Sequence, residues 1–269
     1  MSQISPLAYI HPDAQLGAGV VVEPFAAIYQ DVVIGAESHI ASHVVIHPGA
    51  RIGQKCRIFP GAIISSIPQD LKFNNENTIV RIGDHVTIRE YATINRGTTY
   101  SHETVIEDHV LIMSYVHVAH DCVIERRAIL ANCVNLAGHV TIGEHAVIGG
   151  MSAIHQFIRI GKHVMLSGGS LVGKDVPPYV LAARHPLTYT GVNSVGLRRR
   201  GFDNEQINEI KEIYRYLYQK GYNYRHALEA IEQELADTPL RQDIVAFVRA
   251  SERGIMRRYH SAKAAKDDD

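Results

Sequence analysis

Histidine is the most informative residue type in this chain of 269 residues, which contains 16 histidines and no tryptophan. His117 and His120 lie in the segment HVAHD, His139 follows in LAGHV and His155 in IHQF. Asp121 comes directly after His120. A carboxylate beside an imidazole can fix its tautomer and stabilise its protonated form, as a general base requires. These residues therefore predict acid–base chemistry, provided that the fold brings them together.

Metal binding is a second interpretation of the same histidines, because zinc accepts three neutral imidazoles and a water molecule. A third interpretation is a polar ladder that faces solvent or another subunit. Carbon dioxide hydration at such a zinc site requires neither the pair Asp70 and Lys72 nor the basic run of residues 198–200. Cationic side chains instead suit phosphates. This favours a phosphate-bearing substrate over zinc chemistry without excluding the metal.

A repeat of six residues predicts the elements that position these histidines. Aliphatic residues stand at every sixth position in three series, which run from Ile10 to Ile64, from Ile82 to Ile94 and from Ile106 to Val172 and give 25 hexapeptides. Neither a helical period of 3.6 nor a strand period of 2.0 explains this spacing. Three short strands joined by tight turns do explain it. We therefore expect a triangular β-solenoid with 18 residues per coil.

The coil length predicts which residues share a corner of the solenoid. Counted modulo 18, the four histidines of the first paragraph fall within four positions of one another, and Asp121 lies one coil before His139. They should gather near one column. The same counting aligns a second set in turn positions, which we expect to be solvated: His109, Arg127, His145 and His163.

Two segments interrupt the repeat. Residues 65–79 place Asp70 and Glu76 in inward positions, where unpaired charges are not buried, and residues 95–104 place Tyr100 in an inward position. We expect both segments to be loops that leave the prism. Binding sites are often built on loops that a rigid scaffold holds.

A different pattern follows the repeat after Val176. Asp203 is a candidate N-cap for a helix that ends near Gly221, and two further helices are expected; their proposed core residues are Ile207, Ile210, Tyr214 and Leu217, then Ala227, Leu228, Ile231 and Leu235, then Ile244, Phe247, Val248 and Ile255. We predict a β-helix domain over residues 1–190 and a helical domain over residues 191–269. The helices would cover the strand edges at the open end of the solenoid.

Composition excludes several classes of function. The 27 Lys and Arg residues nearly balance the 28 Asp and Glu residues, so nothing predicts binding to nucleic acid or to anionic membranes. No apolar segment has the length of a membrane span, and the start of the chain lacks a secretory signal. Three cysteines form an odd count that suits a reduced compartment. We expect a cytoplasmic protein without stable membrane insertion.

An ordered set of motifs resembles a known enzyme family. These are IPQDLKF at residues 67–73, HVAHD at 117–121, LAGHV at 136–140, IHQF at 154–157, DVPPYV at 175–180, and GVN and GLRRRGF between 191 and 202. Together they are similar to the UDP-N-acetylglucosamine O-acyltransferases that begin lipid A biosynthesis. The resemblance spans essentially the whole chain and implies a left-handed parallel β-helix that forms a homotrimer with active sites between subunits.

The reaction that this resemblance implies needs no cofactor. An (R)-3-hydroxyacyl chain passes from the phosphopantetheine of acyl carrier protein to the 3-hydroxyl of UDP-N-acetylglucosamine. His120 matches the family's general base, Asp121 its orienting partner and the backbone N–H of Gly138 its proposed oxyanion donor. Because the thioester is already activated, a base and an oxyanion donor suffice, and neither an enzyme nucleophile nor a metal is required.

The resemblance also assigns substrate contacts. They are Gln69, Asp70 and Lys72 for the glucosamine and phosphate, His117, His139, His155 and Gln156 for the sugar and diphosphate, Gly168 for the acyl chain, and Asn193, Arg199 and Arg200 for the nucleotide and carrier-protein end. Val195 stands where well-known members have glutamate, and Asn95 where some have histidine, so acceptor recognition should differ in detail. Glycine at position 168 leaves the acyl groove open, which predicts chains of fourteen or more carbons.

Two other functions fit parts of the pattern. A related N-acyltransferase of the same pathway carries an additional N-terminal domain, whereas this repeat begins by Ile10. Whether the acceptor's 3-position carries oxygen or nitrogen is left open by the sequence. A purely structural solenoid would have no activity, and its loops could be replaced freely.

Overall fold

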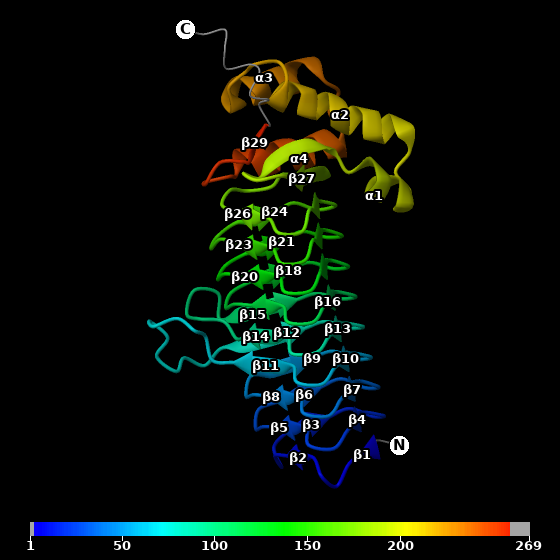
Figure 1. The fold of residues 1–269 in the computed structure, drawn as a ribbon, viewed down its shortest axis with the longest axis vertical. Helices are drawn as coiled ribbons and strands as arrows, with labels where there is room; N and C mark the ends of the chain where they lie inside the picture. The colour runs from blue at the N-terminus through cyan, green and yellow to red at the C-terminus, as the bar shows by residue number, and fades with distance from the viewer. Residues whose placement is uncertain (1–2, 259–269) are drawn as a thin grey trace.

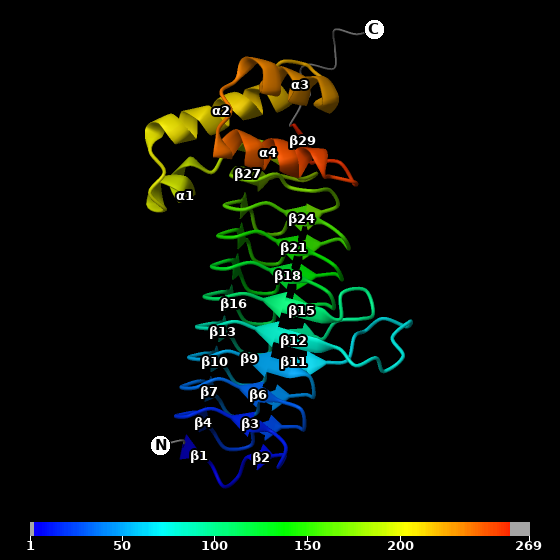
Figure 2. The same cartoon turned by 180° about the vertical axis from the view of Figure 1, so that it is seen from behind.

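The protein forms a long three-sided prism closed at one end by helices (Figures 1 and 2). We describe it from a computed structural model, in which residues 3–258 are described. The last eleven residues of the predicted helical domain, 259–269, lie outside this range. The coils carry the chain from the N-terminal end of the prism to the helical end.

Three sheets form the sides of the prism, and each coil contributes one strand to each sheet. The first sheet contains β1 (Gln3–Ile4), β4 (Val21–Val22), β7 (His39–Ile40), β10 (Arg57–Ile58), β13 (Thr87–Ile88), β16 (Leu111–Ile112), β19 (Ile129–Leu130), β22 (Val147–Ile148), β25 (Met165–Leu166), β27 (Val180–Ala183), β28 (Thr188–Val192) and β29 (Arg257–Arg258). The second contains β2 (Tyr9–Ile10), β5 (Ala27–Ile28), β8 (Val45–Ile46), β11 (Ile63–Ser66), β14 (Thr93–Asn95), β17 (His117–Val118), β20 (Asn135–Leu136), β23 (Ala153–Ile154) and β26 (Leu171–Val172). The third contains β3 (Gln15–Leu16), β6 (Val33–Ile34), β9 (Ala50–Ile52), β12 (Ile79–Ile82), β15 (Glu103–Ile106), β18 (Val123–Ile124), β21 (Thr141–Ile142) and β24 (Arg159–Ile160).

Strand pairing confirms the coil of 18 residues. Val118 pairs with Leu136, which pairs with Ile154, and these strands are parallel. All three side chains are at most 2% exposed, because the second residue of each short strand points into the prism. The aliphatic column predicted from the six-residue period is therefore the core of the β-helix.

Tight turns join the sheets at three corners. We call the turns from the second sheet to the third the loop corner, because the segments 67–78 and 96–102 leave the prism there, between β11 and β12 and between β14 and β15 (Figures 1 and 2). The turns from the third sheet to the first form the stacked corner, and those from the first to the second form the outer corner.

The stacked corner corrects one sequence prediction. His109 and Arg127 are exposed there, as expected, but His145 is only partly exposed and His163 is buried. His163 is 8% exposed and stacks between His145 and Tyr179, with ring centroids 5.0 and 5.6 Å away. Residues from beyond the repeat cover this end of the corner, and the period could not reveal them.

Between the β27–β28 hairpin and residue 258 the chain forms four helices: α1 (Ser194–Arg199), α2 (Asn204–Tyr218), α3 (Tyr224–Glu234) and α4 (Pro239–Arg249). Asp203 caps α2 as predicted, in a capping box with Gln206. Ile255 lies beyond α4 and forms a bridge with Asp175 instead of continuing a helix. In Figures 1 and 2 the helices cover the C-terminal end of the prism. None of the helices within residues 3–258 has the length and apolar character needed to cross a bilayer.

Candidate active site

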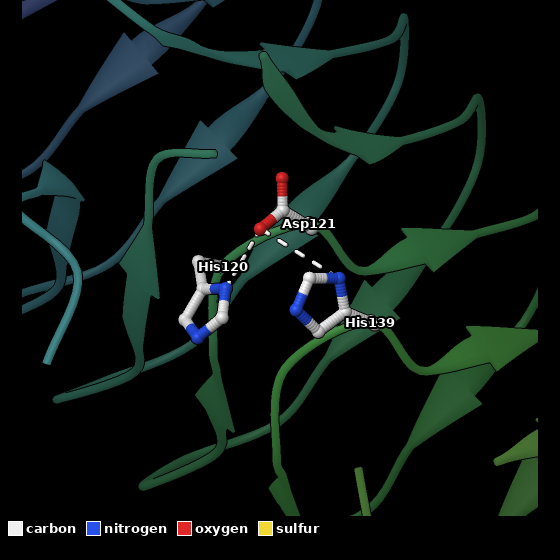
Figure 3. Close-up of side chains that lie close together, drawn as sticks. All are labelled: His120, Asp121 and His139. Carbon is white, nitrogen blue, oxygen red and sulfur yellow. Dashed lines mark hydrogen bonds and ion pairs between the residues drawn. The ribbon is translucent and has the colours of Figure 1, made fainter. Parts of the chain in front are cut away.

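The loop corner brings the predicted catalytic residues together. His120 and Asp121 occupy the turn after β17, and Gly138 and His139 occupy the turn one coil later, after β20. Figure 3 shows Asp121 between the two imidazoles. Both segments that leave the prism emerge at this same corner.

His120 and Asp121 form a hydrogen-bonded dyad. The Nδ1 atom of His120 lies 2.7 Å from Oδ2 of Asp121, and the two side chains are 12% and 0% exposed. With Nδ1–H donating to the carboxylate, the lone pair of Nε2 is available to accept a proton from a substrate. This is the geometry of a general base with its orienting carboxylate.

Residues of the 96–102 segment hold the Asp121 carboxylate. The Thr98 hydroxyl donates to Oδ2 at 2.7 Å and the Ser101 hydroxyl to Oδ1 at 2.5 Å. The backbone N–H groups of Thr98 and Ser101 donate to Oδ1 at 3.0 and 3.3 Å. Burial alone would raise the pKa of Asp121, but the hydrogen bonds from His120, Ser101 and Thr98 outweigh it and hold that pKa well below its ordinary value. Asp121 is therefore an anion at neutral pH.

His139 lies against the dyad in an aromatic setting. Its ring stacks on Phe157 at 4.3 Å between centroids, and Tyr100 and His120 approach it edge-on at 4.4 and 4.9 Å. Burial lowers the pKa of His139, and Asp121, which is 3.8 Å away, opposes that shift. The buried Nδ1 of His139 has no hydrogen-bond partner among the described residues. A neutral imidazole is therefore favoured at this position.

Gly138 is in close contact with the base. A Cβ atom at this position would lie 2.5 Å from Cε1 and 2.7 Å from Nε2 of His120. Only glycine lets the backbone approach the imidazole this closely. The main chain of Gly138 therefore borders the space where a substrate group bound to Nε2 would react.

A cavity of about 570 Å³ opens beside the dyad. Its walls include Tyr100, Asp121, His139, Phe157 and Arg159. Asp121 and His139 thus face a space large enough for part of a small-molecule substrate.

The longer segment, 67–78, carries the predicted acceptor-binding residues. Gln69 and Lys72 are exposed, and Oδ1 of Asp70 accepts a hydrogen bond from the Lys72 N–H at 3.0 Å. The charge of Asp70 acts to raise the pKa of His139. The amide of Asn95, which is 2% exposed, donates to Ser66 Oγ at 2.7 Å and to the Ile67 carbonyl at 3.1 Å. Asn95 thereby fixes the base of the loop.

The remaining histidines of the predicted column lie beside the dyad and not within it. His117 shares a hydrogen bond of 2.8 Å with Thr93 Oγ1, and burial lowers its pKa. His155 is exposed and makes a 3.1 Å contact with the carbonyl of Gln156, which is also exposed.

The other predicted substrate residues lie at different corners of the same chain. Gly168 is at the outer corner, where a Cβ would lie 3.1 Å from the carbonyl oxygen and 3.7 Å from the nitrogen of Gly150. Asn193 caps α1 and donates to the His163 carbonyl, and Arg200 donates to the His145 carbonyl at 2.9 Å, both at the stacked corner. Arg199 is exposed at the end of α1. A single chain therefore does not bring Arg199 to His120.

The donor atoms around Asp121 fit a hydrogen-bonded dyad better than a zinc site. Ligand atoms of His120, Asp121 and His139 lie within 4.8 Å of one another. Two ligands of a tetrahedral zinc ion are about 3.3 Å apart, whereas Nδ1 of His120 and Oδ2 of Asp121 are 2.7 Å apart. Thr98 and Ser101 also occupy the carboxylate lone pairs.

Sequence reasoning missed the roles of Thr98 and Ser101. The chain interrupts its period there, so coil arithmetic does not say where these side chains lie. The available signal was indirect: a buried carboxylate needs donors, and the segment TTYS supplies hydroxyl groups close to the predicted site.

Comparisons with known proteins identify relatives along nearly the whole chain. Residues 175–256 match the family model for domain 2 of UDP N-acetylglucosamine O-acyltransferase, and residues 13–48 and 103–138 match the model of the bacterial transferase hexapeptide. A protein of Chlorobaculum parvum named acyl-(acyl-carrier-protein)-UDP-N-acetylglucosamine O-acyltransferase is 49% identical over 255 residues, which cover 94% of this chain and 97% of the relative. A protein of the same name from Thermodesulfovibrio yellowstonii is 43% identical over 258 residues, covering 96% and 100%.

Solved structures agree with the fold. The crystal structure of a UDP-N-acetylglucosamine acyltransferase from Bacteroides fragilis superposes with a TM-score of 0.93 at 47% identity, covering 94% of this chain and 99% of the other. The predicted left-handed parallel β-helix with a C-terminal helical region is thus confirmed.

Proposed function

The chain belongs to the UDP-N-acetylglucosamine O-acyltransferase family, and from this premise we propose that it transfers an (R)-3-hydroxyacyl chain from acyl carrier protein to the 3-hydroxyl of UDP-N-acetylglucosamine, the first step of lipid A biosynthesis. It is an acyltransferase. The observation that supports the reaction most directly is the 2.7 Å contact between His120 Nδ1 and Asp121, which leaves Nε2 free beside Gly138.

The chemistry proceeds by direct transfer. Nε2 of His120 takes the proton of the acceptor hydroxyl while the oxygen attacks the thioester carbonyl. The backbone N–H of Gly138 stabilises the oxyanion that forms. The C–S bond then breaks, and the imidazolium gives its proton to the leaving thiolate, which restores the neutral His120. Asp121 stabilises that imidazolium and keeps its Nδ1 protonated.

The residues around the dyad suit a sugar nucleotide and a carrier protein. Asp70, Gln69 and Lys72 on the loop, together with His117 and His155, would bind the sugar and diphosphate.

At the C-terminal end, a cavity of about 560 Å³ is lined by Lys174, Arg184, Arg257 and Arg258, among other residues. Cationic side chains there favour association with an acidic carrier protein.

Several further properties belong to the same proposal. The protein acts in the cytoplasm as a homotrimer. It needs no cofactor or metal, because the donor thioester is already activated. Gly168 leaves the acyl groove open, so donors of fourteen or more carbons are preferred. A Cβ at this position would lie 3.1 Å from the Gly150 carbonyl oxygen, so glycine also permits a close approach between successive coils.

The decisive experiment measures acyl transfer by the purified protein from 3-hydroxyacyl carrier proteins of several chain lengths, with bound zinc assayed in the same preparation. We expect product from the native protein and at least a hundredfold less from His120→Ala, as loss of a general base implies, with the oligomer intact. Dissociation of the oligomer in this variant would make His120 structural. A clear preference for a ten-carbon donor would refute the role of Gly168.

Absence of product at every chain length, together with one bound zinc per site, would contradict the acyltransferase proposal. The histidine cluster would then be a metal site. Because the 2.7 Å contact between His120 and Asp121 disfavours zinc, we expect no stoichiometric metal.

A further inference from the structure

The segment between β14 and β15 makes more hydrogen bonds to the dyad than the rest of the chain described here. Of the described groups that donate to Asp121 oxygens, four belong to Thr98 and Ser101, and the fifth is His120 itself. The proposed function gives Thr98 and Ser101 no role.

This segment is longer than coil closure requires. One coil further along, the four residues 119–122 suffice to connect β17 to β18, whereas the seven residues 96–102 connect β14 to β15. The additional residues include both hydroxyl donors. Thr98 is 8% exposed, so its side chain points into the structure and not to solvent. The insertion is therefore folded around the carboxylate.

We propose that Thr98 and Ser101 are positioning residues for the acyl transfer, because their hydroxyl and amide groups fix the Asp121 carboxylate against Nδ1 of His120. This inference rests on the proposed function for its catalytic consequence, although its geometric part does not. Neither residue touches the reacting atoms. They act through Asp121, and Asp121 acts through His120.

The hydroxyl groups also set how strongly Asp121 stabilises a protonated His120. Oδ2 of Asp121 is shared between the Thr98 hydroxyl and His120. Without the hydroxyl donors, more of the negative charge is available to the imidazolium. Protonated His120 is then favoured, and the acidic limb of the activity profile moves to higher pH.

Other titratable groups face the dyad and stay in place when the hydroxyl groups are removed. His139 and Cys122 lie beside Asp121, His117 faces His120, and Asp70 acts on His139. A change in the pH profile of a Thr98 or Ser101 variant therefore reports on the hydrogen bonds that were removed.

The test uses the full-length double variant Thr98→Val and Ser101→Ala, which removes both hydroxyl groups and keeps both backbone donors. We expect kcat to fall at least tenfold, in line with loss of a positioned general base, while the acceptor KM changes less than threefold. The midpoint of the acidic limb should rise by about half a pH unit or more. Thr98→Ser and Ser101→Thr, which retain the hydroxyl groups, should restore both quantities.

A second readout needs no substrate. The rate at which diethyl pyrocarbonate modifies His120, followed by mass spectrometry of the peptide that contains it, reports the neutral imidazole as a function of pH. Its midpoint should rise by the same amount in the double variant. If the native protein transfers no acyl group, the proposed function fails, and this midpoint still decides whether Thr98 and Ser101 act on the dyad.

Ser114→Ala is the matched control. Its hydroxyl donates to the Glu90 carboxylate at 2.8 Å, the same kind of bond at the outer corner. This variant should keep the native midpoint. The proposal is overturned if the double variant retains native kcat, or if its activity falls while the midpoint of His120 modification stays where it is in the native protein.

Discussion

Asp121 has a left-handed backbone conformation with a φ of 59°, as do His139 at 62° and Phe157 at 65° in the equivalent turns of the next coils. This conformation costs a residue other than glycine roughly 1 to 2 kcal/mol. The same turn geometry, repeated at one corner, stacks the ring of His139 on that of Phe157. The site is therefore built on the ordinary turn of the β-helix, and only its residue types are special.

Gly138 provides the sharpest test at the residue scale. A methyl group at this position would collide with the His120 imidazole and not with backbone. Gly138 has no positive φ, so alanine is compatible with the local chain. We expect Gly138→Ala to fold with a melting temperature near that of the native protein but to lose at least a hundredfold in kcat/KM, because the ring must leave its place beside Asp121.

Gly173→Ala is the control for that substitution. Gly173 lies two coils further along the loop corner, and a Cβ there meets nothing within 4 Å. Activity within twofold of native is expected. If Gly138→Ala also kept native activity, the imidazole would not need its observed position, and the assignment of His120 as the base would be wrong.

The sequence could predict the dyad but not the residues that hold it. The six-residue period places His120, Asp121 and His139 at one corner, because the uninterrupted coils in this part of the chain each have 18 residues. Thr98 and Ser101 belong to an insertion, whose path the period does not determine. Their contacts follow from how a buried carboxylate finds donors in three dimensions, which only the structure reveals.

At the scale of elements, the strands of the repeat were predictable from the sequence, but the short helix and the aromatic residues that cover the stacked corner were not. Each strand contains an inward aliphatic residue at a fixed spacing, whereas α1 has six residues and buries only Leu197. A helix this short has no periodic signal, and it depends on the Asn193 cap and on the stacked corner beneath it. Phe202 and Tyr179 cover His163 from outside the regular turns, which is why its burial was missed.

The buried His163 predicts a pH-dependent stability. Burial, reinforced by the charge of Arg200, lowers the pKa of His163 to about 3, against about 6.5 in an unfolded chain. Between these values the unfolded state binds a proton that the folded state does not, so the free energy of unfolding falls as the pH falls. We expect the melting temperature to decrease from pH 7 to pH 5.

His163→Phe should reduce that decrease. Phenylalanine retains the stack between His145 and Tyr179 and removes a buried Nδ1 that has no partner among the described residues. His145 also has a pKa lowered by burial, so the pH dependence should shrink without vanishing. Melting curves of both proteins at pH 5, 6, 7 and 8 measure it. An equal decrease in melting temperature from pH 7 to pH 5 in the two proteins would show that His163 does not cause the acid sensitivity.

At the scale of the whole molecule, the residues of the proposed site lie at separate corners of the chain. The dyad lies at the loop corner and the exposed Arg199 near the stacked corner, on different edges of the prism. Large apolar side chains are exposed along the outer corner, with Phe25, Tyr91, Tyr115 and Met151 between 55% and 76% exposed. Exposed apolar patches favour subunit contact. The expectation of a trimer came from the resemblance alone, because no period in the sequence encodes an assembly.

Subunit complementation tests whether Arg199 acts on the site of a neighbouring chain. Arg199→Ala and His120→Ala should each be nearly inactive when produced alone. If each site takes His120 from one chain and Arg199 from the next, a mixed trimer contains sites with both residues intact. For equal amounts of the two chains, roughly a quarter of all sites are of this kind. We therefore expect co-production to restore up to about that fraction of native activity, measured as acyl transfer per trimer.

The alternative arrangement gives a different number. If both residues of a site come from the same chain, every chain in the mixture lacks one of them, and co-production restores nothing. Mixing the two purified homotrimers without exchange of subunits is the control, and it should remain inactive under either arrangement. Activity that recovers only after co-production would mean that the loop corner of one chain lies beside the stacked corner of the next chain in the trimer. Activity that stays at the level of the single variants would place the whole site within one subunit.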